Sequence, residues 1–418
     1  MRSNPFPRGL LVIAITLCAA GSQAQALDAW LPSAAEVAAV LKASPQIRSA
    51  RDRQDAQLQR ARGIEAGAGE WTLRLNQQQR RVRDPQERFA ETTLAIDRPV
   101  RLWGKSGLDA LLAEQDREVA RIQLADALHE SSRQLLTHWF EALRAQLDAD
   151  NAARELQLAS ELDRQARIRL RQGDISPLDA RLAEAELQRS QAHATLAQAD
   201  AARSTAQLQR LYPGLRMPSW PQDKDPRPPQ NAIPQDSTVQ HLIEHHHELR
   251  LLKAEAKRQQ QLAERLERER WPDPTIGLYT SRERAGAEQL VGVSVAMPLA
   301  GIHRESQARA AMAEAHMLDH QALELERRLT AGFEARLQRS MYQQQAVNVL
   351  RMAAATQRQA ADKSLIAYTQ GEHSMTELIQ NRRLANEQQI ASQRLLLDWL
   401  LNQAQLELDA HRLWDLDD

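Results

Sequence analysis

Residues 171–179 read Arg-Gln-Gly-Asp-Ile-Ser-Pro-Leu-Asp and separate two long helical stretches. Gly173 breaks the first stretch, and Ser176 followed by Asp179 is the capping-box pattern of a new helix. Pro177 stands at the first helical position, where proline is best tolerated. We therefore expect the chain to reverse direction at this segment, with Asp179 as a helix cap.

The stretch before this segment predicts a very long helix. Residues 108–172 contain neither glycine nor proline, and a continuous helix of that length would extend about 100 Å. Apolar side chains recur every fourth residue at Leu135, Trp139, Leu143 and Leu147. Such a narrow apolar stripe indicates coiled-coil packing against neighbouring helices.

The segment occurs a second time. Residues 369–377 read Thr-Gln-Gly-Glu-His-Ser-Met-Thr-Glu, and Trp71 and Pro99 have counterparts at Trp271 and Pro298 in the same order. An internal duplication accounts best for these collinear matches. The predicted organisation is a first repeat over 27–212, a proline-rich linker over 213–234 and a second repeat over 235–418.

Each repeat also predicts a β-hairpin. Residues 71–75 and 93–96 flank the turn signal Asp84-Pro85, and residues 276–279 and 291–295 flank Gly286. Strands of about ten residues suit a tilted membrane crossing; a pair of soluble hairpins is the alternative. Because hydrocarbon does not tolerate an open sheet edge, membrane-spanning hairpins would require several copies of the chain.

The composition excludes several classes of protein. The chain has 54 basic and 55 acidic side chains, which argues against nucleic-acid binding. With only 15 glycines and 4% aromatic residues it is expected to be mostly helix. No phosphate loop, catalytic triad spacing or compact pair of catalytic carboxylates is visible, so we expect neither an enzyme nor a cofactor.

The N-terminus has the layout of a secretory signal. Arg2 and Arg8 precede an apolar run from Gly9 to Ala20, and small residues follow up to Ala26. We expect residues 1–26 to be a cleaved signal peptide, with a retained anchor as the alternative. Cys18, the one cysteine, lies inside this segment, and whether it is lipidated stays open. The mature chain would then contain no thiol.

With these features together, the chain resembles the TolC-like outer-membrane efflux factors. The resemblance is carried by the two tips, by Ile96-Asp97-Arg98-Pro99 before Trp103-Gly104-Lys105, and by residues 293–298 in the second repeat. It implies a mainly α fold with two tandem repeats: long coiled-coil hairpins form a periplasmic tunnel, and four strands per chain enter a shared trimeric barrel. It implies a passive exit duct in the outer membrane, mostly periplasmic, contacting outer-membrane lipid and docking to a periplasmic adaptor and an inner-membrane pump.

The resemblance also implies a gate at the second tip. The family carries two acidic positions three residues apart there; the first matches Glu377, whereas the second falls on Gln380. Asp179 is the equivalent in the first tip, where we read it chiefly as a cap. The same resemblance assigns adaptor contact to the tip residues Gly173, Asp174, Ser176, Gly371, Glu372 and Ser374.

A run of histidines lies near the start of the second repeat. The run His241, His245, His246 and His247 suggests a metal site, but we favour a solvated helix start because no zinc-protease pattern follows.

The Trp-Gly-Lys motif at residues 103–105 favours the branch of the resembled family that exports heavy-metal cations. The alternative function is a periplasmic coiled-coil adaptor or scaffold protein without a channel.

Overall fold

The computed structural model describes residues 27, 29–67, 69–219, 239–299, 301–414 and 416. The expected signal peptide and linker residues 220–234 lie outside the described residues. The elements of the first half are α2 (Ala34–Ala43), α3 (Pro45–Ala66), β1 (Thr72–Val82), β2 (Glu87–Pro99), α4 (Lys105–Gln172) and α5 (Pro177–Leu211). Those of the second half are α6 (Val239–His245), α7 (His247–Arg268), β3 (Thr275–Glu283), the short η1 (Arg284–Gly286), β4 (Glu288–Ala296), α8 (Ile302–Thr369) and α9 (Met375–Asp409).

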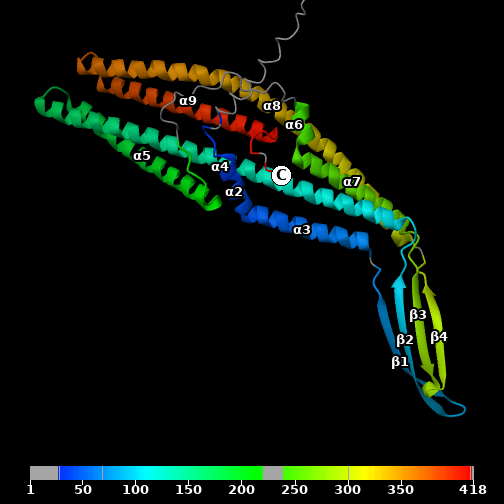
Figure 1. Ribbon diagram of the computed structural model, residues 1–418. Coiled ribbons are helices and arrows are strands. Elements are labelled where there is room, and N and C mark those ends of the chain that lie inside the picture. The colour runs from blue at the N-terminus through cyan, green and yellow to red at the C-terminus, as the bar shows by residue number, and fades with distance from the viewer. Residues whose placement is uncertain are drawn as a thin grey trace, which may run out of the picture. The chain divides into compact units, whose positions relative to one another are not determined.

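The predicted fold class is confirmed. Both halves run through two shorter helices, a hairpin, a 68-residue helix and a 35-residue helix (Figure 1). The equal lengths of the paired helices are what a duplicated unit would produce. The strands form one antiparallel sheet in the order β1-β2-β3-β4. None of the described helices is both long and apolar enough to cross a bilayer.

Two compact units divide the chain differently from the two halves. Of the described residues, the first unit contains those within 27–47, 128–245 and 329–416, and the second contains those within 48–127 and 246–328. Each half of the sequence therefore contributes to both units. The first unit holds the helix tips, and the second holds the sheet with the helix segments that lead into it.

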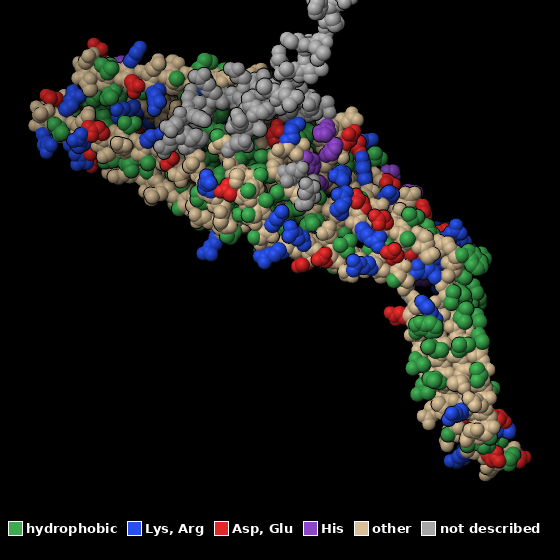
Figure 2. All heavy atoms as spheres, viewed as in Figure 1, with side chains coloured by type: hydrophobic (Ala, Val, Ile, Leu, Met, Phe, Trp, Pro, Cys, Tyr) green, Lys and Arg blue, Asp and Glu red, His purple; other side chains and the backbone are tan. Residues whose placement is uncertain are grey.

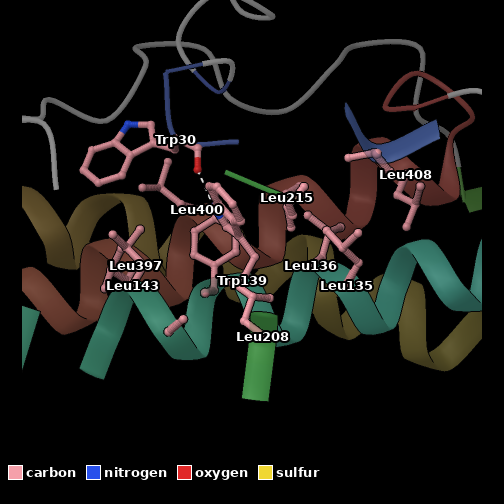
Figure 3. Packing of buried hydrophobic residues seen from close by; sticks show 14 of the residues in the cluster. Trp30, Leu135, Leu136, Trp139, Leu143, Leu208, Leu215, Leu397, Leu400 and Leu408 are labelled. Carbon is pink, nitrogen blue, oxygen red and sulfur yellow. Dashed lines mark hydrogen bonds between the residues drawn. The ribbon is translucent and has the colours of Figure 1, made fainter. Parts of the chain in front are cut away.

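The core of the first unit contains the apolar positions that the sequence singled out. Leu135, Trp139, Leu143 and Leu147 are all buried, together with Trp399 of α9. Figure 3 shows Leu135, Trp139 and Leu143 packing between α4 and α9. The indole Nε1 of Trp139 donates a 2.7 Å hydrogen bond to the carbonyl of Trp30. The bond satisfies the polar atom of a buried tryptophan, which would otherwise oppose its burial.

The sheet of the second unit has two chemically distinct faces. The register places Leu73, Ile96, Leu278 and Val293 in one row across all four strands, and all four side chains are exposed or partly exposed. This first face, which we call the apolar face, also carries Leu75, Leu94, Ile276, Val291 and Val295. Hydrophobic side chains run along the sheet in Figure 2. A soluble sheet would bury such a face, so its exposure indicates contact with lipid or with another protein.

The opposite face of the sheet, the polar face, is held together by charged and hydroxyl groups. Arg74 pairs with Asp97 at 2.8 Å, and Arg80 pairs with Glu91 at 3.0 Å and with Glu283 at 3.3 Å. Asp97 and Glu91 are buried among these partners. Alternation along each strand therefore places all the acidic side chains of the strands on the polar face, opposite the rows of Leu, Ile and Val.

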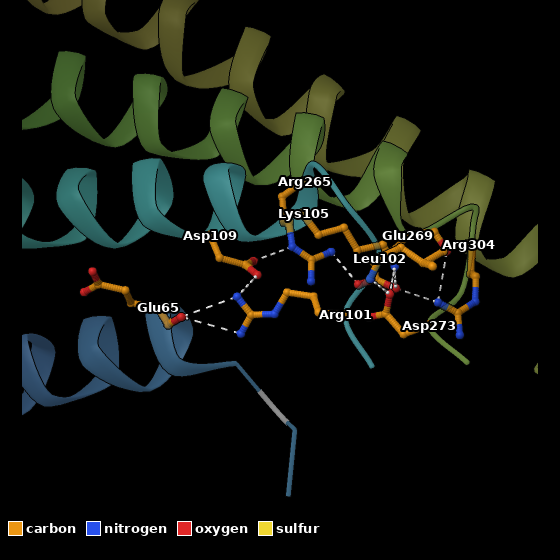
Figure 4. Close-up of polar contacts among 9 residues, drawn as sticks. All are labelled: Glu65, Arg101, Leu102, Lys105, Asp109, Arg265, Glu269, Asp273 and Arg304. Atoms are coloured by element: carbon orange, nitrogen blue, oxygen red, sulfur yellow. Dashed lines mark hydrogen bonds and ion pairs between the residues drawn. The ribbon is translucent and has the colours of Figure 1, made fainter. Parts of the chain in front are cut away.

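A network of ion pairs fixes the helices where the hairpins begin (Figure 4). Lys105 at the start of α4 is 2% exposed, and its Nζ lies 2.9 Å from Asp273 and 3.4 Å from Glu269. Arg304 of α8 also reaches Glu269 at 2.9 Å. Burial opposes ionisation of Glu269, but Arg265 and Lys105 outweigh it and lower the pKa of this carboxyl. The lysine of the Trp-Gly-Lys motif therefore has a structural role: it ties the start of α4 to Glu269 and Asp273.

Candidate gate at the helix tips

The two tips close in the same way. Gly173 and Gly371 have φ angles of 79° and 81°, a left-handed conformation that glycine adopts without steric cost. The next backbone N–H groups, of Asp174 and Glu372, each donate a 2.9 Å hydrogen bond to a carbonyl five residues back. This is the Schellman closure of a helix end, and Figure 1 shows both tips at the same end of the helical hairpins.

Both second helices begin with a complete capping box. The backbone N–H of Asp179 donates to Ser176 Oγ at 3.1 Å, and that of Glu377 donates to Ser374 Oγ at 3.2 Å. In return Glu377 Oε2 accepts from the backbone N–H of Ser374 at 2.8 Å. The backbone and side-chain hydrogen bonds from Ser374 lower the pKa of the Glu377 carboxyl, so it is ionised at neutral pH.

Glu377 and Gln380 lie together on the exposed side of α9. They are three residues apart and both exposed, whereas the intervening Leu378 and Ile379 are buried. Leu378, Ile379 and Met375 pack with Leu162 of α4 and with other apolar side chains of the tips. This small core fixes the rotation of the first turn of α9, and so keeps Glu377 and Gln380 facing outward.

Asp179 differs from Glu377 in its surroundings. These include Tyr368 and Arg169, two residues that the sequence analysis did not identify. Asp179 is partly buried, and its charge contributes to the raised pKa of Tyr368, whose main cause is burial. The Tyr368 ring lies 5.1 Å from the guanidinium carbon of Arg169. Among the described residues, the Tyr368 hydroxyl has no hydrogen-bond partner. Tyr368 comes just before the second tip and Arg169 just before the first, so the two tips meet at this ring.

Behind the tips, a second set of ion pairs ties three helices together. Glu186 of α5 is 7% exposed and pairs with Arg189 at 2.7 Å and with Arg383 of α9. Burial raises the pKa of this carboxyl, but the two arginines overcome that effect and lower it. Arg189 also pairs with Glu155 of α4. The helices carrying the tips are thus linked by charge as well as by apolar contact.

The histidine run does not gather into a metal site among the described residues. The rings of His241 and His245 are 4.3 Å apart and exposed. The expected solvated helix start is wrong for His247, which is 2% exposed in the first turn of α7. No group of three or more His, Cys, Asp or Glu side chains in the described ranges is placed to hold a metal ion.

The polar face of the sheet carries an excess of negative charge. The strand residues that point to this face include Glu87, Glu91, Asp97, Glu283 and Glu288, against Arg74 and Arg80. All the other charged side chains of the strands lie on the apolar face and are arginines. A conduit bordered by the polar face would therefore be electronegative and attract cations.

Comparison with known proteins places this fold. No family model matches the chain. The cobalt-zinc-cadmium resistance protein CzcC of Cupriavidus metallidurans is 26% identical over 221 residues, which are 52% of this chain and 52% of that protein. The chain thus matches about half the length of this curated relative.

Solved structures match over nearly the whole chain. The outer-membrane channel OprN is similar with a TM-score of 0.76 at 14% identity, covering 94% of this chain and 92% of that one. CusC gives a TM-score of 0.73 at 13% identity over 93% and 92%. The outer-membrane protein VceC of Vibrio cholerae gives 0.70 at 16% identity over 94% and 96%. At these identities the similarity establishes the fold.

Proposed function

We propose that this chain, which has the TolC-like fold of these outer-membrane channels, is the outer-membrane component of a tripartite efflux system. The single observation that carries the proposal is the two-faced sheet. One face exposes a continuous apolar surface over all four strands, and the other is polar and charged. A membrane strand is apolar towards lipid and polar towards its lumen, as these strands are.

The free edges of the sheet require more than one copy of the chain. β1 and β4 each pair on one side only within the described sheet. In hydrocarbon the unpaired backbone groups would cost several kcal/mol each. The alternation of strand directions lets β4 of one copy pair antiparallel with β1 of the next. We propose a homotrimer with a closed barrel, the number three coming from the family resemblance.

The long helices supply the rest of the duct. α4 and α8 have 68 residues each, which corresponds to about 100 Å of helix. We propose that three copies of these hairpins enclose a periplasmic tunnel, that the tips contact the adaptor, and that the pump delivers solute to this end. The role is passive, and no chemical step is assigned to the chain.

Divalent metal cations are the cargo that we propose. The polar face of each sheet has a net charge of −3, and Glu377 adds a carboxylate at the second tip of each copy. CzcC, the curated relative, is named for resistance to cobalt, zinc and cadmium. The charge of the duct and the name of the relative point to the same class of solute.

Fractionation tests the proposal against a periplasmic scaffold without a channel. The full-length chain should be recovered with outer membranes, require detergent for extraction, and show the mass of three copies after cross-linking. Deletion of its gene in the source bacterium should lower tolerance to cobalt, zinc or cadmium. Recovery as a soluble periplasmic protein would favour the scaffold instead, because a chain whose apolar sheet is in contact with lipid should not leave the membrane without detergent.

A further inference from the structure

The charged residues on the apolar face are arginines, and three of them gather towards the hairpin ends. Arg81 of β1, Arg88 of β2 and Arg282 of β3 point to the apolar face, where the four described strands carry no acidic side chain. All three side chains are exposed. None of the ion pairs formed by the described residues includes any of the three, whereas the neighbouring Arg80, on the polar face, pairs with Glu91 and Glu283.

The register makes this cluster unusual. Arg81 and Arg88 are directly opposite each other across the β1–β2 pair, so their Cβ atoms are about 5 Å apart and their like charges repel. Arg282 is level with Thr92, which follows Arg88 by four residues on β2, a distance of about 13 Å along the strand. An anion between Arg81 and Arg88 would remove the repulsion, and guanidinium groups bind phosphate through paired hydrogen bonds.

The position of the cluster along the strands identifies the anion. Towards the helices the apolar face carries the rows of Leu, Ile and Val side chains, and the row that contains Arg282 is completed by Gln77, Thr92 and Gln289. The face thus changes from apolar to basic and amide-bearing along the strand, as a surface does when it passes from hydrocarbon into a headgroup layer. Both acidic and basic side chains are visible at the hairpin ends in Figure 2.

We propose that Arg81, Arg88 and Arg282 bind the phosphate groups of lipids in the leaflet that surrounds the hairpin ends. This inference rests on the proposed membrane channel and adds a lipid class to it. The amide side chains between the arginines supply further donors to phosphate or sugar oxygens. The acidic side chains of the strands all lie on the polar face, so none of them is placed beside the lipid phosphates to repel them.

Lipid retention by the trimer tests the proposal. Purified protein is placed in nanodiscs of phosphatidylcholine alone, with phosphatidylglycerol, or with diphosphorylated lipid A, and the lipid kept after detergent washing is measured by native mass spectrometry. We expect the wild type to retain the phosphate-rich lipid selectively. The R81Q/R88Q/R282Q variant should lose about five-fold in retention for each arginine removed, and R81K/R88K/R282K should keep most of it.

R80Q is the matched control for each single substitution, because it removes one arginine charge from the polar face instead of the apolar face. Inorganic phosphate should not displace the lipid. The proposal is overturned if the triple glutamine variant retains lipid like the wild type, if R80Q loses as much per charge removed, or if free phosphate competes equally. Conductance of every variant in pure phosphatidylcholine is recorded first, so that failure of the channel itself is recognised separately from failure of lipid binding.

Discussion

Glu377 combines a structural task with the electrostatic one proposed for it. Its carboxylate accepts hydrogen bonds from the backbone and hydroxyl of Ser374, and it stays exposed. Because its pKa is lower in the folded chain, its stabilising effect is present at neutral pH. The effect is lost only as pH falls through the lowered folded value.

Substituting Glu377 by glutamine should separate these tasks, since glutamine also completes a capping box. We expect E377Q to fold normally and to weaken block by a trivalent cation by about ten-fold or more. Gln380 provides the opposite change: Q380E adds a carboxylate to the same exposed side and should strengthen block. Single-channel titration with the blocker measures both. Unchanged block in both variants would remove Glu377 from the gate.

Tyr368 is the second residue whose role can be tested. Its hydroxyl is buried beside Asp179 with no hydrogen-bond partner among the described residues. Y368F should therefore leave the thermal stability nearly unchanged, within about 1 kcal/mol. If the hydroxyl donates to Asp179 when copies close together, the same variant should raise the open probability of the channel. Y342F, at an exposed tyrosine of α8, is the control that should change neither quantity.

At the scale of elements, the tips depend on the conformation of their glycines. A Cβ at Gly371 would meet nothing within 4 Å, so the penalty of G371A comes from its φ of 81° alone and should be about 1–2 kcal/mol. Gly332 lies inside α8 with equally open space, and G332A should stabilise by about 0.5–1 kcal/mol. Thermal melts of the two variants should therefore shift in opposite directions; shifts of the same sign would contradict this account.

The sheet should distinguish sharply between adjacent residues. Leu75 points to the apolar face and Asn76 to the polar face. We expect L75R to cost about 2–4 kcal/mol in the membrane, whereas N76R should be tolerated because it faces water. The yield of trimer recovered from outer membranes reports the difference. Equal loss in both variants would show that the faces are not divided between lipid and lumen.

Elements with local signals could be predicted from the sequence. The breaks at Gly173 and Gly371, the capping boxes and the Asp84-Pro85 turn each depend on residues within a few positions, and the structure has all of them. The sequence also indicated the apolar stripe of α4, because helical periodicity determines which side chains share a face.

Pairings between distant residues could not be predicted in this way. Lys105 meets Asp273, and Arg383 meets Glu186, across more than 160 positions, and nothing local distinguishes these charges from the many solvated ones. The meeting of Tyr368 with Arg169 depends on how two helical hairpins pack. The apolar strand positions could be recognised in the sequence. Only the register of the strands shows that Arg81, Arg88 and Arg282 share the apolar face.

For the whole molecule, the central claim is that several copies enclose one electronegative duct. The claim combines the free edges of β1 and β4, the acidic polar face and the outward carboxylate at each second tip. Each feature is present in a single chain, but only an assembly converts them into a path for solute. Charge around such a path raises the local concentration of cations.

The most direct test is single-channel recording of the purified full-length protein in a phosphatidylcholine bilayer under a potassium chloride gradient. The account predicts discrete conductance steps, a reversal potential that shows cation preference, and block by a trivalent cation added on the side of the helix tips. Absence of discrete conductance from detergent-extracted trimer, or a reversal potential showing anion preference, would contradict it.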